Sequence, residues 1–294
     1  MSHPQKRFQK LARTPQELVT HLLAKGLTIP SHTVAQNAIS RIGYYRLLIY
    51  MRPLQHPATK QFQAHATFDD ILSLYNFDRE LRLLCMDAIE KIEVSLRAAI
   101  VNPLAVNLGA HFHVRSRHFD KPEGFKEFME ATSKLRKSLA VEHYYNNYND
   151  PALPPIWVVL EGLTYGTLSR MYSNLHTKNR KLAAREFGYD EAVLVSWFRA
   201  INELRNRCAH HNRLVDVTMN ANAPTAPRAL RAEFASAVGN KFCKHAIVLV
   251  ALLARIDHSS TWKTDLKALF AKYPTVPEAS LGFPAAFQTR PFWL

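Results

Sequence analysis

Residues 67–103 read TFDDILSLYNFDRELRLLCMDAIEKIEVSLRAAIVNP, and this stretch decides the fold class. Its apolar side chains recur at steps of three and four residues, which is the period of one face of an α-helix. They are Ile71, Leu74, Tyr75, Leu81, Leu84, Ala88, Ile92, Leu96 and Ile100. The pattern predicts one long amphipathic helix, or two in line, that ends at Pro103. Glu93 and Arg97 stand four residues apart and are expected to pair on its polar edge.

Helical patterns also fill most of the remaining chain. Thr14-Pro15-Gln16-Glu17 combines a hydroxyl N-cap, a proline at the first helical position and a glutamate three residues after the cap, which predicts a helix start. Further helices are expected from Ser31 to Pro53 with an interruption at Gly43, over 122–140, 156–175, 190–211 and 229–256, and briefly in the tail. Only nine of the 294 residues are glycine, and no strand-like alternation extends beyond a few residues. We therefore predict an all-α protein.

The same patterns divide the chain into three parts. Residues 1–62 are expected to form a helical lead-in that packs on the core, residues 63–258 the core, and residues 259–294 a C-terminal tail. A loop rich in Asn, Ala and Pro, from Thr218 to Pro227, lies between the last two core helices. Gly162 and Gly166 stand four residues apart, so they are expected to let a neighbouring helix approach closely.

The charge of the chain points to a polyanionic partner. It carries 38 Lys and Arg against 24 Asp and Glu, a formal net charge of +14 with histidines neutral. An excess of this size is typical of proteins that bind nucleic acid or an anionic membrane surface, and composition favours nucleic acid.

Cysteine usage and hydropathy indicate a cytoplasmic protein outside the membrane. Cys85, Cys208 and Cys243 lie in helix-like apolar patterns and cannot form a full disulfide framework, as expected in a reducing compartment. Residues 1–13 are polar and basic without an apolar centre, so no signal peptide is predicted. The longest apolar run, Ala246 to Ala254, has nine residues. A spanning helix needs about twenty, so this run is expected to be a buried core helix.

The candidate site is the stretch Arg205-Asn206-Arg207-Cys208-Ala209-His210-His211-Asn212-Arg213, which closes the helical pattern begun at Asp190. An arginine clamps phosphate through a planar fork, and a histidine transfers protons near neutral pH. On a regular helix five residues turn through about 500°, so Arg205 and His210 lie roughly 140° apart, whereas Asn206 and His210 share a face. A site that uses all three needs a helix that ends inside the motif, and we expect that end near His211.

These residue types suit cleavage of an RNA backbone without a metal. RNA carries its own nucleophile, the 2′-hydroxyl, and a histidine that moves its proton contributes about 10²- to 10⁴-fold. Arg205 would stabilise charge on the phosphoryl oxygens, and Asn206 would orient the histidine or the scissile phosphate. Spacing alone equally supports a structural interpretation, in which Arg205 and Arg207 complement the helix C-terminus and His210 or His211 caps it.

The pattern Arg205-Asn206-x-x-x-His210 resembles the motif of HEPN ribonucleases. A set of further segments, in the same order, resembles the Abi-like (abortive infection bacteriophage resistance) branch of that superfamily over about residues 10–290. The segments cover residues 26–30 (GLTIP), 41–47 (RIGYYRL), 68–72 (FDDIL), 75–79 (YNFDR), 92–97 (IEVSLR), 163–169 (LTYGTLS) and 207–211 (RCAHH).

The resemblance implies a HEPN-type helical bundle that forms a homodimer, with two motifs in one composite groove. It also implies a metal-independent endoribonuclease that acts as a toxin or in phage defence, without a cofactor. Some members of the family are thought to be restrained by a small RNA, so an inhibitory or guide-like RNA is a further expected partner. By position the catalytic residues are Arg205, Asn206 and His210. His211 is the alternative imidazole, because the family tolerates variable spacing.

Other basic and aromatic residues are weaker candidates. An RNA-binding role is assigned to Arg207, Arg213, Arg115, Arg117, Lys134 and Lys137. Tyr44, Tyr45, Tyr144 and Tyr145 suit base stacking, but packing in a core or interface is favoured for them. Cysteines and histidines near the motif fit no usual zinc spacing, so no metal site is predicted. The competing functional class is a non-catalytic RNA-binding or interaction module with the same fold and basic surface.

Overall fold

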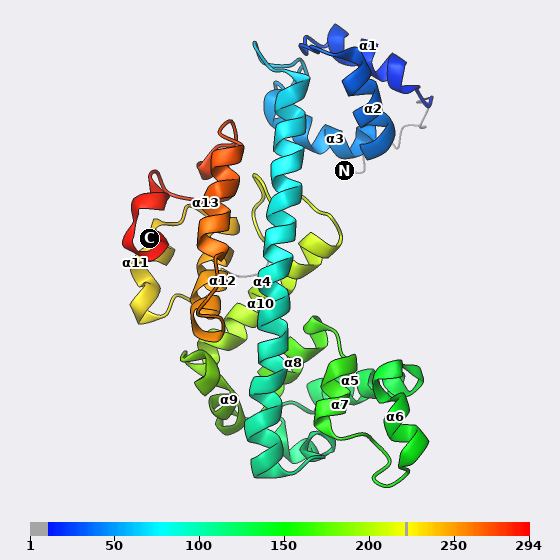
Figure 1. The fold of residues 1–294 in the computed structure, drawn as a ribbon, viewed down its shortest axis with the longest axis vertical. Helices are drawn as coiled ribbons and strands as arrows, with labels where there is room; N and C mark the ends of the chain where they lie inside the picture. Colours follow the sequence, from blue (N-terminus) through cyan, green and yellow to red (C-terminus); the bar gives the residue numbers. More distant parts are fainter. Residues whose placement is uncertain (1–10, 221–222) are drawn as a thin grey trace, which may run out of the picture. The chain divides into compact units, whose positions relative to one another are not determined.

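The computed structural model describes residues 11–220 and 223–294, which fold as an all-α protein (Figure 1). Over these residues there are thirteen α-helices joined by loops and 3₁₀ turns, and only isolated β-bridges instead of strands. The predicted fold class is therefore confirmed. Most of the predicted polar N-terminus (residues 1–10) and part of the predicted loop (residues 221–222) lie outside the described residues.

The helices follow one another in this order: α1 Pro15–Ala24, α2 His32–Ile42, α3 Tyr44–Met51, α4 Phe68–Leu108, α5 Pro122–Lys134, α6 Leu139–Asn147, α7 Ile156–Gly162, α8 Tyr165–Asn174, α9 Thr177–Ala184, α10 Glu191–Ala209, α11 Arg231–Ser236, α12 Phe242–Ile256 and α13 Trp262–Lys272. The apolar run from Ala246 to Ala254 lies in α12, whose side chains are almost all buried, as predicted. In the described ranges, no helix is both long and apolar enough to cross a membrane.

The chain forms two compact units. The first comprises Met1–Arg79 with Tyr273–Val276, and the second comprises Glu80–Lys272 with Pro277–Leu294. The boundary at Arg79 falls within α4, so this helix supplies its first turns to one unit and the remainder to the other. The lead-in expected from the sequence, residues 1–62, lies wholly in the first unit.

The first unit begins as the sequence predicts. The Glu17 N–H donates to Thr14 Oγ1 at 3.3 Å, and the Thr14 N–H donates to Glu17 Oε2 at 2.7 Å, which completes the capping box of α1. Gly43 has φ +92°, a conformation that L side chains rarely adopt, and it separates α2 from α3. Buried apolar side chains of α1, α2, α3 and the start of α4 form the core of this unit.

The helix α4 is confirmed as one long element, but the predicted end at Pro103 is wrong. The helix continues to Leu108 with Pro103 inside it. Proline removes one helical N–H and crowds the preceding turn, at a typical cost of about 3 kcal/mol. Ile100 and Leu104, on either side of it, are completely buried, and this packing offsets the loss. Asn107 Nδ2 also donates to the Pro103 carbonyl at 2.6 Å.

The single helix predicted over 156–175 is wrong, because the chain breaks between α7 and α8. Leu163 is extended, and Thr164 starts α8 with its hydroxyl accepting the Thr167 N–H at 3.4 Å. Arg97 makes the break stable: its Nε donates to the Leu160 carbonyl at 2.9 Å and its Nη2 to the Leu163 carbonyl at 3.1 Å. The predicted Arg97–Glu93 pair is confirmed at 2.7 Å. A long-range side chain thus decides where α7 ends.

Two other predicted helices are also divided. The helix expected over 122–140 separates at Ser138 into α5 and α6, and α6 continues to Asn147, beyond the predicted end. The helix expected over 229–256 separates into α11 and α12 around Gly239, which has φ +68°. Gly239 has a positive φ, which glycine adopts readily, so it interrupts a helix that apolar spacing alone would continue. Ser138 is extended, and its hydroxyl makes no capping hydrogen bond to α6.

Candidate active site at the end of α10

The candidate site lies in the second unit and is built on α10. The predicted apolar stripe of this helix is confirmed as buried and comprises Val193, Leu194, Trp197, Phe198, Ile201 and Leu204. The helix α8 packs against α10, and a Cβ added at Gly166 would lie 3.0 Å from Asn202 Oδ1. The close approach predicted for Gly162 and Gly166 is confirmed at Gly166, but the two glycines do not lie on one helix, because Gly162 ends α7. The packing fixes the axis of α10 and with it the direction of its polar face.

The helix ends where the sequence predicts, inside the motif. His210 is the C-cap residue, and its N–H donates to the Asn206 carbonyl at 3.0 Å. The His211 N–H donates to the Cys208 carbonyl at 3.0 Å and the Asn212 N–H to the Arg207 carbonyl at 2.8 Å, which together form a Schellman motif.

The two neighbouring histidines have different backbone conformations. His210 has φ −89° and ψ 11°, whereas His211 has φ +57°, in the left-handed region where this motif usually has glycine. A side chain there costs about 1–2 kcal/mol. His211 therefore turns the chain away from the helix, and His210 remains in line with its polar face.

A groove of about 490 Å³ runs along the end of α10. Its lining residues are Arg199, Asn202, Glu203, Asn206, Arg207, His210, Asn212 and Asn220. Those from α10 recur at three- and four-residue steps, so they occupy one face of the helix. Asn206 and His210 thus line the same groove, and both side chains are exposed.

Glu203 connects two parts of the groove through hydrogen bonds. Its Oε1 accepts the Arg207 Nε–H at 3.2 Å and the Asn220 backbone N–H at 2.7 Å. The Glu203 and Arg207 side chains are only 15% and 16% exposed, so solvent weakens this ion pair less than it would on an open surface. One carboxylate therefore fixes an arginine on the groove and the loop that forms its wall.

The loop after the motif returns along the side of α10. Trp197 Nε1 donates to the Thr225 carbonyl at 2.8 Å, and the Thr225 N–H donates to Ser196 Oγ at 3.0 Å. Earlier in the same loop, the Met219 N–H donates to the Asn240 carbonyl at 2.8 Å. The wall of the groove is thus attached to α10 and to the start of α12 instead of being free.

Replacing Glu203 by alanine is expected to destabilise the protein by about 1–3 kcal/mol, because Arg207 and the Asn220 N–H lose their acceptor. Glu203→Gln keeps one oxygen acceptor and is expected to lose less. Urea unfolding followed by circular dichroism measures both, with Glu90→Ala on the exposed side of α4 as the control. Equal stability of the Glu203→Ala and Glu90→Ala variants would contradict the assigned role.

Arg205 lies away from this groove. It is half-buried and is not among the lining residues, and within the described residues its buried Nε makes no hydrogen bond. One chain therefore brings Asn206 and His210 together but does not add Arg205. The guanidinium groups that line the groove belong to Arg199 and Arg207.

Two buried titratable groups lie on α12, and one of them, His245, lies near Glu203 and Arg207 of the groove. Burial lowers the pKa of His245 to about 4, although the Lys241 backbone and Glu203 oppose the shift. Burial likewise raises the pKa of the Cys243 thiol to about 12. Both side chains are therefore neutral near neutral pH. Among the described residues, no three His, Cys, Asp or Glu side chains cluster as metal ligands would.

The remaining predicted RNA-binding residues lie outside the groove. Arg115, Arg117 and Lys134 are exposed, whereas Arg213 is half-buried and donates to the Asp216 carbonyl at 3.4 Å. The side chain of Lys137 lies outside the described part of the chain. The segment around Arg115 is not solvated throughout, because its neighbours His113 and His118 are buried.

Burial of His113 predicts a loss of stability in acid. Both ring nitrogens are buried, with no hydrogen-bond partner in the described ranges, and burial lowers the pKa to about 4, with a smaller effect of His111. Between pH 6.5 and about 4 the unfolded chain binds a proton that the folded protein does not, so stability falls as the pH falls. His113→Phe is expected to make this fall shallower in urea titrations at about pH 7 and about pH 4.5. An unchanged pH dependence would contradict the assignment.

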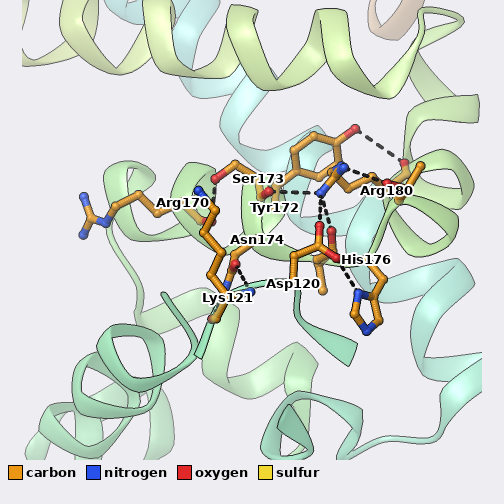
Figure 2. A network of polar contacts seen from close by, with 10 residues as sticks. Asp120, Lys121, Arg170, Tyr172, Ser173, Asn174, His176 and Arg180 are labelled. Atoms are coloured by element: carbon orange, nitrogen blue, oxygen red, sulfur yellow. Dashed lines mark hydrogen bonds and ion pairs between the residues drawn. The ribbon is translucent and has the colours of Figure 1, made fainter. Parts of the chain in front are cut away.

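A second polar network, shown in Figure 2, fastens the same segment to the connection between α8 and α9. Arg180 Nη1 donates to Asp120 Oδ2 at 2.9 Å, and His176 Nδ1 lies 2.5 Å from Asp120 Oδ1. The Asn174 amide bonds both backbone groups of Lys121, at 2.9 and 3.0 Å. The hydrogen bond from His176 and then Arg180 lower the pKa of Asp120. Since its groups bond one another and the backbone, this network serves the fold.

Sequence reasoning missed Glu203, Arg199 and Asn202 as groove residues. The signal was available, because they precede His210 by seven, eleven and eight residues and so lie on its helical face. Asn212 and Asn220 are different, since their place depends on how the loop returns. No periodic pattern encodes that path.

Comparison with known proteins adds one finding. No curated protein and no solved structure matches the chain. The family model described as Abi-like protein matches residues 37–216, more than half of the chain, including the motif and most of the groove. The chain therefore belongs to the Abi-like protein family.

Proposed function

We propose that this protein is a metal-independent endoribonuclease of the HEPN type that acts in phage defence by abortive infection or as a toxin. The observation that carries the proposal is that Asn206 and His210 line one groove at the end of α10. These residues match the HEPN ribonuclease motif in a chain of the Abi-like family. RNA is the proposed substrate, and the net charge of +14 supports a polyanionic partner.

The proposed reaction is transesterification. The 2′-oxygen attacks the adjacent phosphorus, the bond from phosphorus to the 5′-oxygen breaks, and the products are a 2′,3′-cyclic phosphate and a 5′-hydroxyl. A base takes the 2′-hydroxyl proton and an acid supplies a proton to the leaving 5′-oxygen, so the step needs no water or metal. His210 is assigned to proton transfer, and Asn206 to holding the phosphate or the imidazole.

The position of Arg205 supports a composite site in a homodimer. Because Arg205 does not line the groove of its own chain, one groove contains only part of the motif. Two α10 ends that face each other would supply two imidazoles, one as base and one as acid, and would bring arginines to the phosphate from both chains. Light scattering after size exclusion tests this, and an active monomer would contradict it.

The same observation favours the second candidate, a non-catalytic RNA-binding module. A groove without Arg205, but lined by Arg199 and Arg207, can bind phosphate without stabilising a transition state. Incubation of the purified protein with single-stranded RNA, with and without EDTA, separates the two. Cleavage that persists in EDTA and leaves cyclic phosphate ends supports the enzyme. RNA that is bound but not cut supports the module.

A further inference from the structure

We infer that the first unit carries its own binding groove for single-stranded nucleic acid, separate from the proposed cleavage site. A groove of about 1450 Å³ lies between α1, the start of α3 and the turn that follows α3, and all its lining residues fall between Leu11 and Lys60. The inference does not rest on RNA cleavage in the second unit. It rests on the charge, the aromatic side chains and the backbone of this groove.

Cations dominate the groove. Arg13, Lys25, Arg52 and Lys60 line it together with two histidines, whereas Glu17 is the only carboxylate among the lining residues. In the described part of the chain, none of the four cations forms an ion pair. A concave surface with an excess of cations attracts a polyanion.

The carboxylate of Glu17 already accepts hydrogen bonds within its own helix start. Glu17 Oε2 accepts the Thr14 N–H at 2.7 Å and the Thr14 hydroxyl at 3.0 Å, because it completes the capping box of α1. Burial lowers the pKa of His21 in α1, and two of the cations, Lys25 and Arg13, lower it further. The field of the groove is therefore positive where α1 borders it.

An exposed tyrosine stands beside these cations. Tyr45 lines the groove and is 81% exposed, so of the predicted core or interface packing the core is excluded for it, whereas Tyr44 is half-buried. The left-handed turn at Gly43 starts α3 at Tyr44, and this start has no side-chain cap. A largely exposed aromatic ring in a basic groove suits stacking on an unpaired base.

His56, in the turn after α3, supplies a hydrogen-bond donor to the groove. His56 Nδ1 accepts the N–H groups of Ala58 and Thr59, both at 3.3 Å, so its proton is on Nε2. Lys60 closes the turn with φ +59°, in the left-handed region, and its N–H donates to the His56 carbonyl at 3.0 Å. A side chain held there is a strained feature of the kind found at binding sites.

These features together select a single strand. In a duplex the bases are stacked on one another, so Tyr45 has no face to contact, whereas the bases of a single strand are free. The other candidate occupant is the beginning of this chain, but residues 1–10 contain Lys6, Arg7 and Lys10 and no carboxylate. Their charge repels the groove, so charge complementarity favours the nucleic acid.

Fluorescence anisotropy of the full-length His210→Ala protein with labelled oligouridine, oligothymidine and a duplex tests the inference. Tyr45→Ala is expected to weaken oligouridine binding by about 5- to 150-fold. Arg52→Glu with Lys60→Glu is expected to reduce the slope of log K against log salt by roughly 1.4, since each phosphate contact to a single strand contributes about 0.7. Equal affinity for oligothymidine extends the site to DNA, and tighter binding of the duplex would overturn it.

The control variants carry the same kinds of substitution at exposed positions in the second unit. Tyr148, which is 56% exposed in the second unit, provides Tyr148→Ala, and the exposed Lys126 provides Lys126→Glu. The inference would be overturned if Tyr148→Ala lost as much affinity for oligouridine as Tyr45→Ala. It would also be overturned if poly-glutamate displaced oligouridine completely and bound the Tyr45→Ala variant as tightly as the protein with Tyr45. Binding that depends on Tyr45 in a protein that cuts no RNA would refute the proposed enzyme and leave this groove established.

Discussion

Replacement of His210 by alanine is expected to reduce the rate of RNA cleavage by about 10²- to 10⁴-fold, the usual contribution of a positioned acid or base. The backbone of His210 caps α10 through its N–H, which alanine retains, so the fold is expected to survive. Cleavage of a labelled single-stranded RNA under single-turnover conditions, at matched circular dichroism spectra, measures the loss. His258→Ala, at an exposed position outside the groove, is the histidine control.

Comparing a His211 variant with His210→Ala identifies which of the two imidazoles is catalytic. Its backbone is left-handed at φ +57°, where glycine is favoured, so His211→Gly removes an imidazole and relieves strain. This variant is expected to keep cleavage, because His210 is the proposed catalytic imidazole. If His211→Gly loses activity while His210→Ala keeps it, the catalytic imidazole is His211 and the assignment made here is wrong. If both variants cleave as well as the wild type, the motif is not catalytic.

Replacement of Trp197 by alanine is expected to destabilise the protein by about 3–5 kcal/mol, the usual loss for a large buried aromatic side chain. Trp197 is completely buried between Tyr189 and Phe234, with ring centroids 4.6 and 6.5 Å away. Its Nε1 also holds the Thr225 carbonyl, so the loop that forms the wall of the groove loses an anchor. Urea unfolding gives the stability, and the cleavage assay gives the effect on the site.

The Trp197→Phe variant separates the effect of burying the ring from the effect of its hydrogen bond to the loop. Phenylalanine keeps most of the buried surface but leaves the Thr225 carbonyl without its donor, for an expected loss of about 1–3 kcal/mol. A Trp197→Ala protein that unfolds at the wild-type urea concentration would contradict the packing described here. A Trp197→Phe protein with unchanged stability would show that the indole N–H does not anchor the loop.

The elements that local patterns encode were predictable. The capping box at Thr14, the apolar stripe of α10 and the end of that helix near His211 were all predicted from neighbouring residues, and all are confirmed. Their physical causes act over one or two helical turns, so they are visible in the sequence.

The errors have long-range causes. The break after α7 depends on Arg97, more than sixty residues away, and the continuation of α4 through Pro103 depends on burial of the flanking turns. At the candidate site, helical arithmetic correctly separated Arg205 from the face shared by Asn206 and His210. It did not show the wall at Asn220, because that wall is placed by Glu203 and Trp197 acting on distant parts of the loop.

The Schellman motif at the end of α10 lowers the entropic cost of binding the proposed substrate. Successive backbone hydrogen bonds fix His210, His211 and Asn212 in the free protein. A ligand that binds through His210 therefore orders the two side-chain torsions of the imidazole, but not the backbone that carries it. The cost of ordering the backbone is already met when the protein folds, including the left-handed conformation of His211. The backbone at the end of α10 is thus ordered before any ligand binds.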